Sequence, residues 1–263
     1  MEPPLPGART AHTPAHYGSV VSVLTRPELQ RLAERPLLGR ALAGRLIAGL
    51  HAEDGLRVAA GLLHDGWAVA LEHRPGSADD GRAELAGLIA RAPALAGDVE
   101  VTVPAEAAEL AAAATEAGLG VVLDGDPHAV DALLADRPRA RTVVRSGEPG
   151  AEARCRELGG DRVRLRACPG AAAHLAFVRC VDVLMAGDGD PAVAAGDPRL
   201  VAITGERAAW HGRAADSWEY VMPWRVRPFD QRRLAAAGAR VRVAVVSGPG
   251  AGAALFGRPE RSR

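Results

Sequence analysis

The sequence predicts an α/β protein, an eight-stranded barrel of the TIM type in which parallel strands alternate with helices. Three observations favour this fold class. Eight short apolar runs alternate with segments of helical periodicity along the chain. The length of 263 residues suits one barrel domain. Parallel strands joined by helices close most simply as a barrel, which places the chemistry at the C-terminal ends of the strands.

Each predicted strand is a short apolar run, and each predicted helix has apolar residues at helical spacing. The strands are expected at residues 67–71, 99–103, 121–123, 141–144, 162–165, 192–194, 219–222 and 241–246. The helices are expected at residues 37–50, 55–63, 82–91, 105–117, 129–134, 151–158, 171–185, 200–210 and 231–236.

The two ends of the chain are predicted to be the least regular parts. Prolines at the start favour a flexible leader over residues 1–22, which leaves residues 23–263 as a single barrel domain. Residues 248–257 are rich in glycine and alanine, so the last helix is predicted to be short or frayed. Residues 248–253 (GPGAGA) have the glycine pattern of a dinucleotide loop, but the chain that follows is too short for the rest of such a unit.

Composition excludes several classes of function. The 32 basic residues are balanced by 32 acidic ones, which argues against a nucleic-acid partner. No apolar stretch is long enough to cross a membrane, so we expect a cytoplasmic protein without a membrane partner. All basic residues are arginine, which excludes any mechanism that needs a lysine. Cys155, Cys168 and Cys180 lack metal-ligand spacing, and no metal site is predicted.

Polar residues follow two of the predicted strands. Asp124, Asp126 and His128 come directly after residues 121–123, where barrel enzymes keep catalytic carboxylates and metal ligands. Asp126 is equally well explained as the N-cap of the next helix. Glu72 and His73 end another strand, and a lone histidine there is more often a hydrogen-bonded structural group than a functional one.

Three arginines, Arg162, Arg164 and Arg166, alternate along one predicted strand and so share one face. Three inward arginines would form an anion site, and three outward ones would be solvated. Because a barrel strand also has an outer face that helices cover, at least one partner carboxylate is required. We expect Asp124 and Arg164 to point toward one mouth of the barrel.

From about Arg45 to Arg261 the chain resembles the FAD-dependent proline dehydrogenases of bacteria. The resemblance is clearest in residues 177–189 and 197–200, in residues 218–222 (WEYVM) with Arg227 and Gln231, which are similar to the EFQMLYGIR segment of the family, in residues 240–243 (RVRV), and in residues 71–73 (LEH). It implies a distorted barrel that binds FAD and oxidises L-proline.

The chain departs from this family at most catalytic positions. Thr102 stands where the family has its active-site lysine. The other departures are at flavin or substrate positions: Arg145 and Val221 for glutamines, residues 195–197 for a THD or SHD segment, Gly170 and Ala244 for tyrosines, and Gly257 for one of two arginines that clamp the carboxylate of proline. What matches is Asp124 and Arg258 at catalytic positions and Arg164 at a flavin position.

These departures predict a barrel that has lost proline oxidation and binds FAD weakly or not at all, since several ligand contacts are lost together. Such a pseudoenzyme would have a binding or regulatory role, with an intact paralogue as its partner. The alternative is a divergent FAD-dependent enzyme that still oxidises L-proline, or binds a similar small amino acid, with Arg145, Arg166 or Trp224 as compensating residues. A third hypothesis is new chemistry that uses Asp124, Asp126, His128 and His73 with a bound metal.

Overall fold

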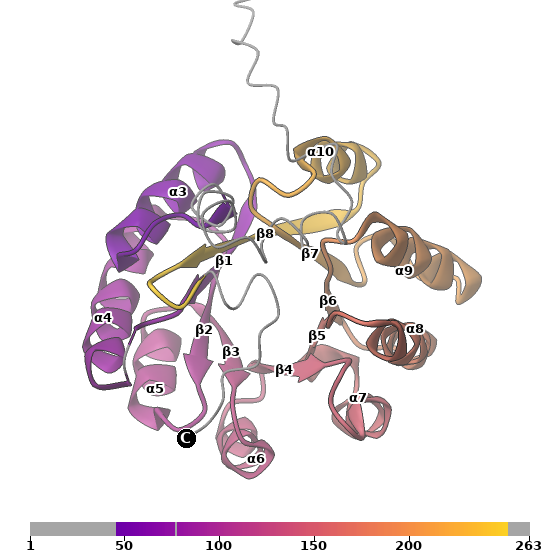
Figure 1. Ribbon diagram of the computed structural model, residues 1–263, viewed down its shortest axis with the longest axis horizontal. Helices are drawn as coiled ribbons and strands as arrows, with labels where there is room; N and C mark the ends of the chain where they lie inside the picture. The colour runs from indigo at the N-terminus through magenta and orange to yellow at the C-terminus, as the bar shows by residue number, and fades with distance from the viewer. Residues whose placement is uncertain (1–45, 77, 252–263) are drawn as a thin grey trace, which may run out of the picture.

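The protein folds as a closed barrel of eight parallel strands surrounded by helices (Figure 1). The computed structural model describes residues 46–76 and 78–251. The strands are β1 (Ala68–His73), β2 (Val99–Pro104), β3 (Gly120–Asp124), β4 (Arg141–Arg145), β5 (Val163–Arg166), β6 (Ala192–Ala194), β7 (Glu219–Pro223) and β8 (Arg240–Ser247). The eight-stranded barrel predicted from the sequence is confirmed.

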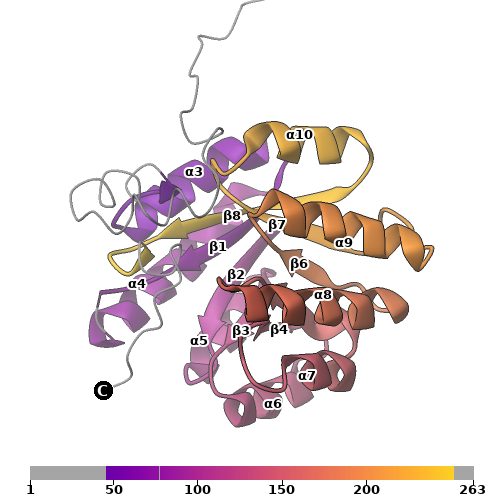
Figure 2. The same cartoon turned by 45° about the vertical axis from the view of Figure 1, so that its right-hand side comes forward.

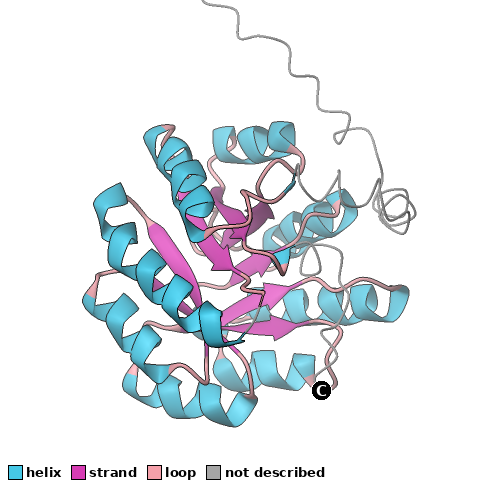
Figure 3. Cartoon of the chain, turned by 60° about the vertical axis from the view of Figure 1, so that its left-hand side comes forward, coloured by secondary structure: helices cyan, strands magenta, loops and turns pink. Residues whose placement is uncertain are grey.

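The helices lie outside the ring of strands, as Figures 2 and 3 show from two further sides. They are α3 (Ala52–His64), α4 (Ala78–Arg91), α5 (Ala108–Glu116), α6 (Pro127–Asp136), α7 (Ala151–Leu158), α8 (Ala171–Ala186), α9 (Pro198–Trp210) and α10 (Pro228–Ala236), with short 3-10 turns η2 (Ala92–Leu95) and η3 (Gly160–Arg162). The described helices lie where helical periodicity predicted them, with ends that shift by a few residues.

The strands pair in sequence order, and the ring closes between its first and last members. β1 and β8 are parallel and pair over six residues, from Ala68 beside Arg242 to His73 beside Ser247. Because every strand runs in the same direction, all the C-terminal strand ends meet at one mouth of the barrel. We call this end the mouth.

Strand alternation gives the barrel two different faces. Outward side chains such as Val69, Leu71 and Val245 pack with the helices in a large hydrophobic core, and a second core lies around Phe177 and Leu184. The inward apolar side chains are small: Ala70, Ala192, Val221 and Ala244 form a cluster of their own, against which Ala194 packs. Barrel interiors are usually filled by bulky branched side chains, so the small apolar side chains of this inner cluster are unusual.

Several sequence-based expectations concern residues outside the described ranges, and others differ from the structure. The described residues do not include residues 1–22, most of the helix expected at 37–50, the last helix and Arg258. Residues 47–50, the described end of that expected helix, are not helical, so this part of the prediction is wrong. Arg162 was expected in a strand, which is wrong: it ends η3, and β5 begins one residue later. Cys155 and Cys180 are buried and unbridged, as expected of small hydrophobic side chains, whereas Cys168 is unbridged but only partly buried. Within the described part of the chain, no helix combines the length and the apolar character that a membrane span requires.

Candidate functional site

The mouth of the barrel holds a cluster of five charged side chains, which we call the mouth cluster: Glu72, Arg74, Asp124, Arg145 and Arg166. Asp124, Arg145 and Arg166 are the last residues of β3, β4 and β5. Glu72 is the next-to-last residue of β1, and Arg74 follows that strand. Parallel strand ends therefore bring together residues that are far apart in the sequence.

Arginines surround both carboxylates of this cluster. Nη2 of Arg145 lies 2.5 and 2.7 Å from the two carboxylate oxygens of Asp124, and Nη2 of Arg74 lies 3.1 Å from Oδ2. Nη2 of Arg166 donates to Oε1 of Glu72 at 2.5 Å, and Nη2 of Arg74 lies 3.5 Å from Oε2. Arg74 thus connects the two carboxylates. These short charged contacts are the strong kind of hydrogen bond.

Both carboxyl groups stay ionised at neutral pH. Burial raises the pKa of Asp124, but Arg145 and Arg74 lower it by more, so its pKa lies below the ordinary value. Burial likewise raises the pKa of Glu72, and Arg166 and Arg74 more than offset that effect. Neither group is therefore prepared to donate a proton, and as a base each is weakened by its arginine partners.

A second ionic cluster lies toward the N-terminal ends of the strands. Glu100 accepts a hydrogen bond from Arg141 at 2.7 Å and lies 3.3 Å from Nε of Arg242. Glu219 accepts from Arg141 at 2.9 Å and from Arg242 at 3.2 Å. Burial raises the pKa of Glu219, yet Arg242 and Arg141 hold it below its ordinary value. Because the chemistry of such barrels lies at the mouth, ion pairs at this opposite end have a structural role.

Arg164 lies inside the barrel between these two clusters. Its side chain is fully buried, and Nη2 donates to Glu100 near the start of β2. Burial lowers the pKa of Arg164 to about 10, while Glu72 and Glu219 oppose the shift, so the guanidinium is charged at neutral pH. Asp124 and Arg164 were expected to point toward one mouth. Asp124 lies at the mouth, but Arg164 donates its hydrogen bond to Glu100 in the cluster at the opposite end of the barrel.

The structure does not bring the other candidate residues to the mouth cluster. Asp126 caps α6 and accepts from the backbone N–H groups of His128 and Ala129 at 2.9 and 3.3 Å, as its alternative explanation predicted. His73 is turned away from the interior, toward Ser247 and Glu84. Among the described residues, no three histidine, cysteine or acidic side chains are arranged to hold a metal ion.

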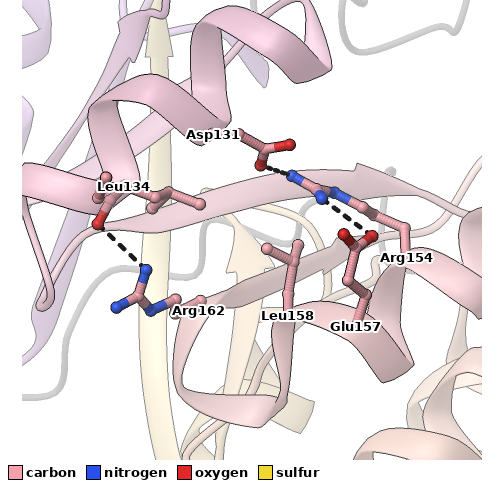
Figure 4. Close-up of a pocket in the computed structure, with 7 residues that line it drawn as sticks. Asp131, Leu134, Arg154, Glu157, Leu158 and Arg162 are labelled. Carbon is pink, nitrogen blue, oxygen red and sulfur yellow. Dashed lines mark hydrogen bonds and ion pairs between the residues drawn. The ribbon is translucent and has the colours of Figure 1, made fainter.

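Arg162 lies outside the barrel, away from Arg164 and Arg166. It donates to the backbone oxygen of Leu134 at 3.1 Å and lines a surface pocket of about 300 Å³ (Figure 4). The pocket lies between α6 and α7, where Arg154 is paired with both Asp131 and Glu157. The predicted face of three arginines therefore contains only two, and each has the partner carboxylate that was required.

Sequence reasoning missed Arg74, Glu100, Arg141, Glu219 and Arg242. A signal for two of them was present: Glu100 stands between valines, and Glu219 stands between aromatic residues, within runs that were expected to be strands. A charge inside a strand that is covered on its outer face must point inward and find an opposite charge. The identity of the partner depends on strand register, which the sequence pattern leaves open.

Solved structures of bacterial proteins resemble this barrel. Proline utilization A from Bdellovibrio bacteriovorus, inactivated by N-propargylglycine, matches with a TM-score of 0.67 and 14% identity over 82% of this chain and 32% of its own. The protein from Corynebacterium freiburgense gives 0.62 and 14% identity over 90% and 33%, and a Bradyrhizobium japonicum mutant gives 0.61 and 17% over 84% and 31%.

The barrel has the fold of one part of proline utilization A. This agrees with the resemblance found in the sequence. The chain spans about a third of the length of these proteins. No protein-family model matches the sequence, and no curated protein matches it. The similarity to proline utilization A at this level of identity concerns the fold alone.

Proposed function

We propose that this protein is a proline dehydrogenase-like barrel that does not oxidise proline and that has a binding or regulatory role. Its proposed ligand is L-proline or a similar small amino acid, and its proposed protein partner is an intact paralogue. A cytoplasmic location stays a prediction of the sequence.

The observation that supports this proposal most is the pairing of Asp124. The resemblance assigns Asp124 a catalytic position, yet Arg145 contacts both of its oxygens and Arg74 contacts one of them. The side chain is 8% exposed. A substrate group that needed this carboxylate would have to displace a charged, nearly bidentate hydrogen bond, which is costly in a buried site.

The residues of the mouth do not fit the flavin that the resemblance implies. Arg145 and Arg166, the compensating arginines considered for an anionic cofactor, are bound to Asp124 and Glu72. A pyrophosphate would compete with two buried carboxylates for the same guanidinium groups. The N-terminus of α9 is also occupied, because Asp197 accepts from the N–H of Arg199 at 2.8 Å.

Anaerobic titration of the purified, FAD-treated protein with L-proline tests the proposal. We expect that no flavin co-purifies with the protein, that added FAD is retained weakly, and that millimolar proline does not bleach the flavin. Bleaching at or below that concentration would establish the alternative, a divergent FAD-dependent enzyme that forms 1-pyrroline-5-carboxylate. The Asp124→Asn variant is the control, because bleaching by this protein would slow in the variant whereas bleaching by a contaminant would not.

A further inference from the structure

Arg164 is the most deeply buried cation of the barrel, and most of its donors are unused. Its side chain is 0% exposed, and Nη2 bonds to Glu100. Nε and Nη1 find no hydrogen-bond partner in residues 46–76 and 78–251. Buried donors that belong to a charged group are costly to leave unpaired, and native proteins satisfy nearly all of them. The two nitrogens therefore indicate that something else binds here.

A second polar atom on the inner face is also unpartnered. Thr102 lies two residues after Glu100 on β2, so it shares the inward face of that strand. Its hydroxyl oxygen is buried, and it has no partner among the described residues. A hydroxyl group can donate as well as accept. The interior thus offers unused donors from two strands.

The charged side chains inside the barrel are shared among several ion pairs. Four buried carboxylates lie inside the barrel: Glu72, Glu100, Asp124 and Glu219. Seven arginines pair with them: Arg74, Arg141, Arg145, Arg164, Arg166, Arg240 and Arg242. The other carboxylates paired with these arginines are Asp98, Asp190 and Glu148, whose side chains are 65%, 39% and 54% exposed. The seven arginines thus meet seven carboxylates in all, and of the arginines only Arg164 and Arg242 are themselves buried.

Arg164 shares its carboxylate partner with two other arginines. Among the described residues, Glu100 is the one carboxylate that accepts a hydrogen bond from Arg164, and Glu100 is shared with Arg141 and Arg242. The strand positions beside Arg164 are Val143 on β4 and Ala192 on β6. Small side chains on the same inner face, such as Ala70 and Ala244, surround the barrel axis. A ligand at this place has to be compact.

We propose that the barrel interior binds one small monovalent inorganic anion, of halide size, through Nε and Nη1 of Arg164, with the hydroxyl of Thr102 as a further donor. An anion would accept from the unused donors, and because these donors belong to a cation, a charged acceptor makes a stronger hydrogen bond with them than a water molecule does. The proposal does not depend on the proposed function, because it involves neither flavin nor proline.

Bromide, which is visible by anomalous scattering, tests this site directly. Crystals of the full chain grown without halide are soaked in sodium bromide. We expect an anomalous peak inside the barrel in contact with Nε or Nη1 of Arg164. Peaks on the surface alone would mean an adventitious ion only and would overturn the proposal, as would a water molecule on Arg164 with no anomalous signal.

Thermal unfolding gives a second test in solution. Sodium bromide is compared with sodium gluconate at equal ionic strength, since an anion that binds only the folded protein raises its Tm. We expect the Tm of the wild type to rise with bromide but not with gluconate, and the difference to vanish in Arg164→Met. Thr102→Val, which keeps the shape of the side chain, is expected to reduce it. An equal rise in the wild type and both variants would overturn the proposal, and the crystallographic result decides if Arg164→Met does not fold.

Discussion

The side chains of His73 and Ser247 join the first and last strands of the barrel. Nδ1 of His73 lies 3.0 Å from Oγ of Ser247, and these residues end β1 and β8 side by side. Nε2 of His73 lies 2.6 Å from Oε2 of Glu84 on α4. Serine, histidine and carboxylate are thus connected as in a hydrolase triad. Ser247 is buried beneath α3, however, where a Cβ atom on Gly55 would lie 2.9 Å from Oγ, so this hydroxyl holds the seam of the barrel instead of meeting a substrate.

Replacing Ser247 tests the structural role of this contact. Ser247→Ala leaves one nitrogen of a buried imidazole without its partner. We expect the free energy of unfolding to fall by about 1–3 kcal/mol, the cost of an unsatisfied buried polar group. Urea unfolding followed by circular dichroism measures the change.

A double-mutant cycle with His73→Gln provides the control. If the two side chains act together, the loss in the double variant differs from the sum of the single losses by at least about 0.5 kcal/mol. Additive losses would show that Ser247 and His73 stabilise the barrel independently.

The fold was predictable because its signals are local. Most strands of the barrel are short runs rich in apolar residues, and parallel pairing follows from the helices between the runs. Arg162 was misplaced because alternation with Arg164 continues one residue beyond the true start of β5. Nothing in the local pattern marks that boundary, since the 3-10 turn η3 leads directly into the strand.

The charged interior was predictable only in part. Strand ends placed Asp124 correctly, and alternation placed Arg164 and Arg166 on one face. The partners could not be found in this way, because Arg145 meets Asp124 and Arg166 meets Glu72 through the stagger of the strands around the barrel. That stagger depends on how all eight strands close, which is a property of the whole fold.

Glu219 provides a test of the cluster at the N-terminal strand ends. Its side chain is 2% exposed and contacts Arg141 and Arg242. Glu219→Gln keeps the shape but leaves these buried cations without one of their counter-charges. We expect a loss of about 3–5 kcal/mol in the free energy of unfolding, measured in urea.

Glu116→Gln is the matched control, because Glu116 is exposed at the end of α5 and makes no ion pair with any described residue. Its loss should stay within about 0.5 kcal/mol. Equal effects of the two substitutions would contradict the assigned role of Glu219.

The lowered pKa of Asp124 predicts how stability depends on pH. The unfolded chain binds a proton at Asp124 at higher pH than the folded protein does. The stabilisation is therefore complete above the pKa of the unfolded chain, about 3.9, and is lost as pH falls through the lower pKa of the folded state. We expect the difference in unfolding free energy between wild type and Asp124→Asn to be largest near pH 7 and to shrink toward pH 3. Asp136→Asn, an exposed position with no ion pair among the described residues, should show no such trend.

Substitutions of Asp126 distinguish a structural role, as the cap of α6, from a chemical role at the end of β3. Oδ1 of Asp126 accepts from the first free N–H groups of α6, and asparagine can do the same without a charge. We expect Asp126→Ala to lower the free energy of unfolding by about 0.5–2 kcal/mol, while Asp126→Asn stays close to the wild type. If the asparagine variant lost as much as the alanine variant, the negative charge of Asp126 would matter more than its hydrogen bonds. That result would point to an interaction of Asp126 with a cation, which a capping residue does not need.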